Sequence, residues 1–265
     1  MIENNIIYSN VSDNILQFLF NKFNKMLPIN NYLKKFIQAF SLFIGTIIVK
    51  ILKIDGYDYS IFNVNKFEVL SGIIALVSIL FELIATKYIS YISFESFVCL
   101  LPICYYTIDY LFNVEKKYDS FIKYKDNIYL LLFFLFVFIA IKFENILNTI
   151  ENTKILIPLI FIVLSVILDS YILHIHKTYG KEDNPNQTLF IYYFIITIGT
   201  GLLLYFIPSI SSIGSIGNIS KYLIPIVLIN ILTGYSAHLL RFYNIINTNS
   251  IQFSLFRYIL PFLNF

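Results

Sequence analysis

The stretch YISYISFESFVCLLP (88–102) has a counterpart later in the chain, NTNSIQFSLFRYILP (247–261). Aligned on their final prolines, the two stretches are 159 residues apart and share five identities: Ile92 with Ile251, Phe94 with Phe253, Phe97 with Phe256, Leu101 with Leu260, and Pro102 with Pro261. Each stretch also follows an apolar run. Membrane proteins with two similar halves are commonly transporters, because such halves can rock about a central site. The repeat therefore predicts a transport fold built from two structural repeats.

The composition places this chain in lipid. Hydrophobic residues make up 58% of it and charged residues only 13%, whereas a soluble domain carries about 25% charged residues. The formal net charge of +3 is not gathered into the basic face that nucleic-acid binding requires. Cys99 and Cys104 lie in one apolar run and form neither a disulfide framework nor a metal motif. We expect a lipid bilayer as surroundings, no nucleic-acid partner, no metal and no cofactor.

Apolar runs long enough to cross a bilayer recur along the whole sequence. A crossing helix needs roughly 17–25 apolar residues, and the runs fall at 36–54, 67–87, 91–112, 128–143, 155–174, 188–207, 221–240 and 249–265. Spanning segments must satisfy their own backbone hydrogen bonds, which favours helices. The sequence predicts an all-α membrane protein with about eight transmembrane helices.

The connections between these runs are short, so we expect one transmembrane domain at 31–265. Its first repeat extends to about residue 150, and its second begins at about residue 151. The domain follows an N-terminal segment, 1–30, in which ILQFLFNKF (15–23) is interpreted as the remnant of a first helix.

The offset also predicts that the bundle is incomplete. Shifted back by 159 residues, the run at 155–174 falls before residue 15, and the chain stops soon after Pro261. A complete pair of five-helix halves has ten helices, so one helix is expected to be missing at each end. Positions such as Gly199 and Thr200 would then face lipid without a partner helix. We expect either a homodimer that covers the gap or a marginally stable protein.

Two segments resemble a known family. ATKYIS (85–90) resembles the A-L-K-Y-[IV]-S sequence of nucleotide-sugar transporters in the drug/metabolite transporter superfamily. The segment LSVILDSYILHIHKTYGKEDNPNQTLFIYYF (164–194) is similar to the sixth-helix region of the branch that carries UDP-galactose, UDP-N-acetylglucosamine and PAPS. Order and spacing agree over about 15–265. The chain departs from the pattern at Glu82, where the family usually has Gln, and at Ser96 and Cys99, where it often has Lys.

The resemblance implies a function. Members of the family are ten-helix antiporters of the Golgi apparatus or endoplasmic reticulum. They exchange a cytosolic nucleotide-sugar, the substrate, for a nucleoside monophosphate, the counter-substrate, by alternating access. No cofactor is involved.

Two cations are candidate contacts for the substrate phosphates. Ionisable groups inside a bilayer cost about 2.5–3.5 kcal/mol and usually face a cavity or a partner. Arg257 occupies the position at which the family keeps Arg or Lys on its ninth helix, and a guanidinium offers two donors to a phosphate. The alternative is an ion pair with Glu95 or Asp109. Lys87 is the second candidate, although a lysine at a helix end also reaches the interface by snorkelling.

Three further residues complete the candidate substrate site. Tyr88 is able to stack on a base or sugar, or else to pack at the membrane interface. Asp169 matches a family position and serves either substrate contact or structural hydrogen bonding. Glu82 is a candidate for proton linkage, against the commoner alternative of hydrogen bonding between helices.

Enzyme motifs are absent from the sequence, which contains neither H-E-x-x-H nor G-x-S-x-G. We therefore expect a protein that is not an enzyme. Two alternatives to nucleotide-sugar exchange stay open. One is a truncated relative that does not transport and acts as a scaffold or partner subunit. The other is a transporter of another phosphorylated metabolite.

Overall fold

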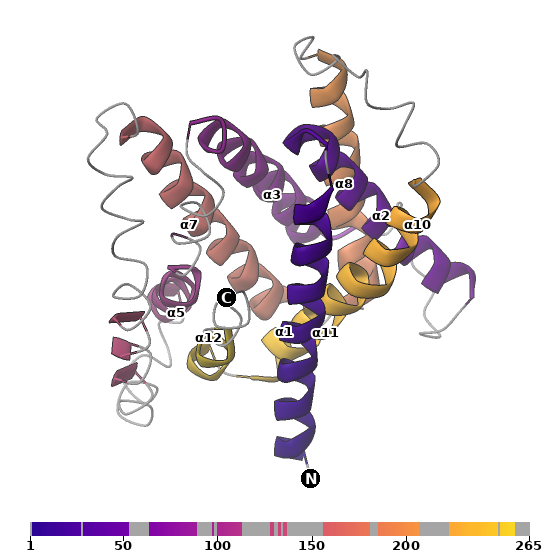
Figure 1. Cartoon of the computed structure of the whole chain (residues 1–265). Helices are drawn as coiled ribbons and strands as arrows, with labels where there is room; N and C mark the ends of the chain where they lie inside the picture. The colour runs from indigo at the N-terminus through magenta and orange to yellow at the C-terminus, as the bar shows by residue number, and fades with distance from the viewer. Residues whose placement is uncertain are drawn as a thin grey trace. The chain divides into compact units, whose positions relative to one another are not determined.

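The computed structural model describes residues 2–27, 29–52, 64–88, 97, 100–112, 128–129, 132–133, 135–136, 156–180, 185–206, 223–248 and 250–257. All regular structure in these ranges is helical, and the helices are shown in Figure 1. They are α1 (Ile2–Met26), α2 (Asn31–Ile51), α3 (Lys66–Ala85), α5 (Leu101–Phe112), α7 (Leu156–Tyr179), α8 (Pro185–Phe206), α10 (Leu223–Asn230), the π-helical turn η4 (Ile231–Tyr235), α11 (Ser236–Asn247) and α12 (Ser250–Arg257).

Five described helices are long and apolar enough to cross a membrane, the pattern of a multi-pass membrane protein. They are α2, α3, α7, α8 and the continuous helix from α10 to α11. Of the three remaining predicted spans, 91–112 contains α5, which has 12 residues, and 249–265 contains α12, which has 8. Most of 128–143 lies outside the described residues. Five of the predicted spans therefore have a described helix long and apolar enough to cross a membrane, and the total of about eight stays a prediction.

The first helix is longer than the sequence predicted. We expected a remnant at 15–23, but α1 runs for 25 residues from Ile2 to Met26. At about 1.5 Å per residue, a helix of this length exceeds the ~30 Å of a hydrocarbon core. Polar side chains recur along one face of α1 and lower the mean hydropathy of the segment. A search for long apolar runs therefore does not find the whole helix.

The chain divides into two compact units, each drawn from both ends of the sequence. Unit 1 comprises Met1–Leu76 and Tyr179–Asn244, and unit 2 comprises Val77–Thr178 and Ile245–Phe265.

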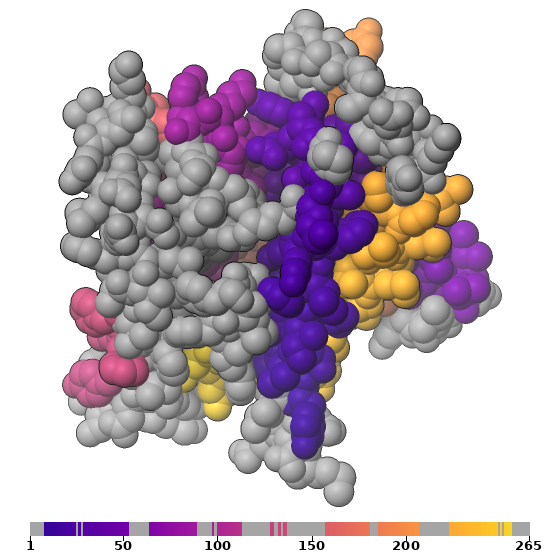
Figure 2. Space-filling model, in the orientation of Figure 1, coloured from indigo at the N-terminus to yellow at the C-terminus, as the bar shows by residue number. Residues whose placement is uncertain are grey.

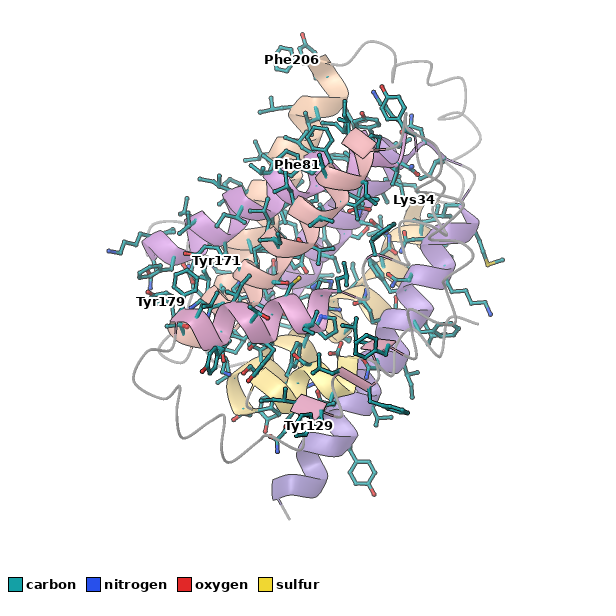
Figure 3. All side chains as sticks on the ribbon, turned by 90° about the vertical axis from the view of Figure 1, so that its left-hand side faces the viewer. Lys34, Phe81, Tyr129, Tyr171, Tyr179 and Phe206 are labelled. Carbon is teal, nitrogen blue, oxygen red and sulfur yellow. The ribbon has the colours of Figure 1, made fainter. Side chains whose placement is uncertain are left out.

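In unit 1, α2 packs against α8 through aromatic side chains. The Phe43 ring lies 5.4 Å from that of Phe190 and 5.6 Å from that of Phe194, between ring centres. At the far end of α8, Phe206 is 70% exposed and projects outward in Figure 3. Exposed aromatic side chains at a helix end are typical of a membrane interface.

Local sequence explains where α3 begins. The Asn65 side chain accepts a hydrogen bond from the Phe67 amide at 3.1 Å, and Glu68 accepts one from the Asn65 amide at 3.0 Å. This reciprocal arrangement is a capping box, which satisfies backbone N–H groups that the helix leaves unpaired. The Glu68 carboxylate also accepts a bond from the Thr188 hydroxyl on α8 at 3.1 Å, so the cap joins two helices.

Gly199 and Thr200 differ from their prediction. Both are buried within unit 1, and Thr200 is only 2% exposed. A Cβ on Gly199 would come within 2.4 Å of the Leu76 side chain, so this position allows close packing of α8 against α3. The prediction that these two positions face lipid was wrong, because both are buried within unit 1 and Gly199 packs against Leu76 of α3.

In unit 2, α5, α7, the end of α11 and α12 share a core made of Tyr105, Leu173, Ile245 and Phe253. The Tyr105 and Phe253 rings meet edge to face, 5.5 Å between centres. The Ser254 hydroxyl on α12 donates to the Pro102 carbonyl at 2.8 Å. Pro102 lies in the first turn of α5, where the missing N–H of proline costs nothing.

Candidate functional site

Helix α1 has a mostly apolar exposed face and a mostly polar buried face. Its exposed residues include Tyr8, Val11, Ile15, Leu19 and Met26, together with Ser12 and Lys22. Figure 2 shows this face, in indigo, open at the surface over much of its length. The buried face carries amides and an acid three, four or seven residues apart: Asn10, Asp13, Asn14, Gln17 and Asn24. A helix in water has the opposite arrangement, so the outer face of α1 suits lipid and its inner face lines a polar interior.

This polar face meets the end of α10 and α11, which lie more than 200 residues later in the chain. The Asn24 amide donates to the Asn230 side-chain oxygen at 2.9 Å, and Arg241 donates through Nη2 to the Gln17 side-chain oxygen at 2.5 Å. Arg241 Nε lies 4.0 Å from the Asp13 carboxylate. These contacts place one acid and one base close together within unit 1.

Asp13 is buried and Arg241 is partly buried, and the two are not tightly joined. The Asp13 side chain is 2% exposed and that of Arg241 is 21% exposed. Nitrogen–oxygen distances in a charge-assisted hydrogen bond are about 2.7–2.9 Å, so the 4.0 Å approach is an ion pair without a hydrogen bond. Burying two charges is expensive unless geometry and hydrogen bonding are good. A loose buried pair is thus a candidate for function rather than for stability.

Further polar side chains from α8 and α11 lie near the pair. Asn244 is fully buried beside the Asp13 carboxylate. Tyr193 is 3% exposed, and its hydroxyl has no hydrogen-bond partner within the described part of the chain. Its ring meets that of His238 edge to face, 5.5 Å between centres, and His238 lies 6.4 Å from the Phe20 ring of α1.

The π-helical turn interrupts the helix where α1 approaches it. Short π-helical segments inside α-helices occur frequently at functional sites. In η4, a Cβ on Gly234 would come within 2.5 Å of the Phe20 ring and 2.9 Å of Leu42. Tyr235 donates from its hydroxyl to the Asn186 side chain at the start of α8. Glycine therefore allows α1 and α2 to approach this turn closely.

Unit 2 holds a second buried cluster of charges. Asp109 on α5 accepts a bond from Lys177 Nζ at 3.0 Å, and its other oxygen lies 3.1 Å from His174 Nδ1. Both partners belong to the last turns of α7. Ser250, the first residue of α12, hydrogen-bonds the same carboxylate. The sequence offered Glu95 or Asp109 as an alternative partner for Arg257; in the described structure Asp109 is bound by Lys177 and His174, and the Arg257 side chain lies outside the described residues.

The five residues predicted as a substrate site all belong to unit 2. Asp169 accepts a bond from the Ser78 hydroxyl at 2.6 Å, which joins α7 to α3. Glu82 is partly buried one turn further along α3, and Lys87 and Tyr88 are exposed in the turn that follows. Arg257 is the last residue of α12, and its side chain lies outside the described residues, as does Glu95.

Sequence analysis missed the unit 1 cluster of Asp13, Gln17, Arg241 and Asn244. A signal was present, because Asn, Asp and Gln recur at helical spacing between residues 10 and 24. Mean hydropathy over a stretch of sequence averages this polar stripe with the apolar face of the same helix. The average therefore reveals neither face. Arg241 follows a long apolar run, where a basic residue is ordinary at a helix end.

Within the described ranges, no group of three or more His, Cys, Asp and Glu residues could hold a metal ion. The chain matches no model of a known protein family. No curated protein matches it either.

Proposed function

We propose that this chain is a multi-pass membrane transporter of a small anionic solute, of the nucleotide-sugar type that its sequence resembles. The observation that carries the proposal is the inverted α1, with lipid-suited residues outside and a buried stripe of amides and one acid inside. Exchange against a nucleoside monophosphate and a place in the Golgi or endoplasmic reticulum membrane rest on the sequence resemblance alone.

A purely structural helix does not need such a stripe. The five buried polar side chains on α1 make hydrogen bonds or electrostatic contacts within the protein, and apolar side chains in the same places would need none of them. Polar residues inside membrane proteins usually mark a pathway for a solute or ion. Arg241 supplies a guanidinium at this stripe, a group suited to binding oxyanions.

The division into two compact units also supports transport. Alternating access needs bodies that move without losing their internal packing. Each unit has its own core: Phe190 and Ile191 in unit 1, and Tyr105, Leu173 and Phe253 among the core residues of unit 2.

The proposal is tested by reconstituting the chain into liposomes loaded with a nucleoside monophosphate and measuring uptake of labelled nucleotide-sugars. We expect saturable uptake of at least one compound, and loss of that uptake in Asn14→Leu, which removes an amide from the buried stripe. Ser12→Leu, on the exposed face two residues away, is the matched control and is expected to transport normally.

No uptake of any nucleotide-sugar or sugar phosphate by folded protein would contradict the proposal. That result would favour the scaffold or partner-subunit alternative.

A further inference from the structure

We infer that Arg241 binds an oxyanion, either a phosphate or a carboxylate. When no solute is bound, the Asp13 carboxylate occupies the place of that oxyanion and so competes with it. The inference deepens the proposed function, on which it rests for the nature of the solute. It assigns the anion site to α1, α8 and α11 of unit 1, whereas the sequence assigned it to Arg257 and Lys87.

The Arg241 guanidinium does not use all of its hydrogen-bond donors within the described ranges. Arg241 donates through Nη2 to Gln17, while its Nε makes no hydrogen bond within the described ranges. Asp13 lies 4.0 Å from Nε, too far to accept that hydrogen. One edge of the guanidinium thus faces a carboxylate without being bonded to it. An oxyanion at hydrogen-bond distance would satisfy that edge better.

A second buried donor lies on α8. The Tyr193 hydroxyl has no hydrogen-bond partner among the described residues, and the Tyr193 ring lies 5.5 Å from that of His238, which is about one helical turn before Arg241 on α11. A hydroxyl and a guanidinium are both good donors to an oxyanion. Each buried donor left unsatisfied is costly, and an anion that reached both would relieve both.

Asp13 neutralises Arg241 in the described state, so the interior of unit 1 carries no uncompensated cation at this point. A bound oxyanion neutralises Arg241 equally well and leaves Asp13 beside Asn244. The charge of Asp13, then uncompensated, opposes tight binding of the anion. A solute that must be released on the other side of a membrane requires such moderate affinity.

The experiment measures binding by purified chain in maltoside micelles free of phosphate. The probes are inorganic phosphate, acetate and UMP, read out by intrinsic tyrosine fluorescence and by thermal stabilisation. Phosphatidic acid forms a separate arm, because a lipid headgroup offers the same chemistry. The chain contains 21 Tyr and no Trp, which makes tyrosine the natural reporter.

Asp13→Asn removes the competitor and keeps the shape, so it is expected to tighten binding of at least one soluble probe by about tenfold. Arg241→Gln is expected to weaken binding by about tenfold or more, and Arg241→Lys to give an intermediate loss, because a lysine keeps the charge without the fork. Lys22→Gln removes a cation from the exposed face of α1 and is the matched control, with unchanged affinity.

Tighter binding by Asp13→Asn is not a consequence of misfolding, so it supports the inference even if Arg241→Gln fails to fold. Unchanged affinity in both Asp13→Asn and Arg241→Lys would overturn it. Stabilisation by phosphatidic acid alone, with none by soluble probes, would also overturn it in favour of a lipid site. Binding without uptake in liposomes would contradict transport while leaving the anion site in place.

Discussion

At the scale of single residues, the buried charges of this chain are held by partners far along the sequence. Asp109 meets Lys177 and His174 across more than sixty residues, and Arg241 meets Gln17 across more than two hundred. Removing one member of a buried pair leaves the other uncompensated, which costs more than the pair itself contributes.

Lys177→Met tests this in unit 2. The buried Asp109 carboxylate would lose its lysine partner, and we expect a loss of about 3 kcal/mol in the free energy of unfolding. Thermal melting in detergent measures it. Lys87→Met, at an exposed lysine, is the control and is expected to change little. In Asp109→Asn/Lys177→Met, part of the loss should be recovered; a double variant as unstable as the sum of both single variants would contradict the coupling.

Gly234→Ala tests the close approach of α1 and α2 to η4. The new methyl would lie 2.5 Å from the Phe20 ring and 2.9 Å from Leu42. We expect a destabilisation of about 1–3 kcal/mol, measured by the shift in melting temperature. Gly201→Ala is the matched control, because its nearest neighbour, Phe36, is 3.3 Å away. Equal shifts in the two variants would show that the contact at Gly234 does not matter.

At the scale of elements, the sequence predicted the positions of the long apolar helices well. Helices α2, α3, α7, α8 and α10–α11 were all expected from runs of hydrophobic residues. Helix α1 was not, since a helix that is polar on its buried face has ordinary mean hydropathy. The pairing of Asp109 was also beyond prediction, because sequence shows which residues are ionisable but not which helix faces which.

Ile15→Lys tests whether the outer face of α1 lies in lipid. Ile15 is 47% exposed and sits near the middle of the helix. A lysine in lipid at this depth costs about 2.5–3.5 kcal/mol, so we expect poor membrane integration and low yield of folded protein. Ile15→Ala is the control for loss of the side chain alone. Normal integration of Ile15→Lys would mean that this face is in water.

At the scale of the whole molecule, each unit is assembled from residues near both ends of the chain. Unit 1 cannot be complete until α8 and α11 have been made, and unit 2 needs α12. A division of this kind is not visible in the sequence, where the repeat instead suggested halves meeting near residue 150.

The two units are expected to open separately. In native-state hydrogen exchange, amides of α1, α2 and α8 should lose protection together, and those of α5, α7 and α12 should form a second group. Arg241→Gln should raise exchange chiefly in the first group, and Lys177→Met chiefly in the second. One common opening free energy for all of these helices would contradict this division.

The π-helical turn at Ile231–Tyr235 also determines the direction in which the side chains of α11 point, relative to those of α10. A π turn holds one residue more than the α-helical turn it replaces, and each residue of an α-helix advances the direction of a side chain by about 100°. Were η4 to tighten into an α-helical turn, every side chain after it would rotate by that amount relative to α10, and Arg241 would turn away from Gln17 and Asp13. Deleting Leu232, which is 68% exposed, would remove the extra residue and hold the side chains of α11 permanently in the rotated orientation. The extra residue in the π-helical turn therefore determines whether Arg241 faces the polar stripe of α1.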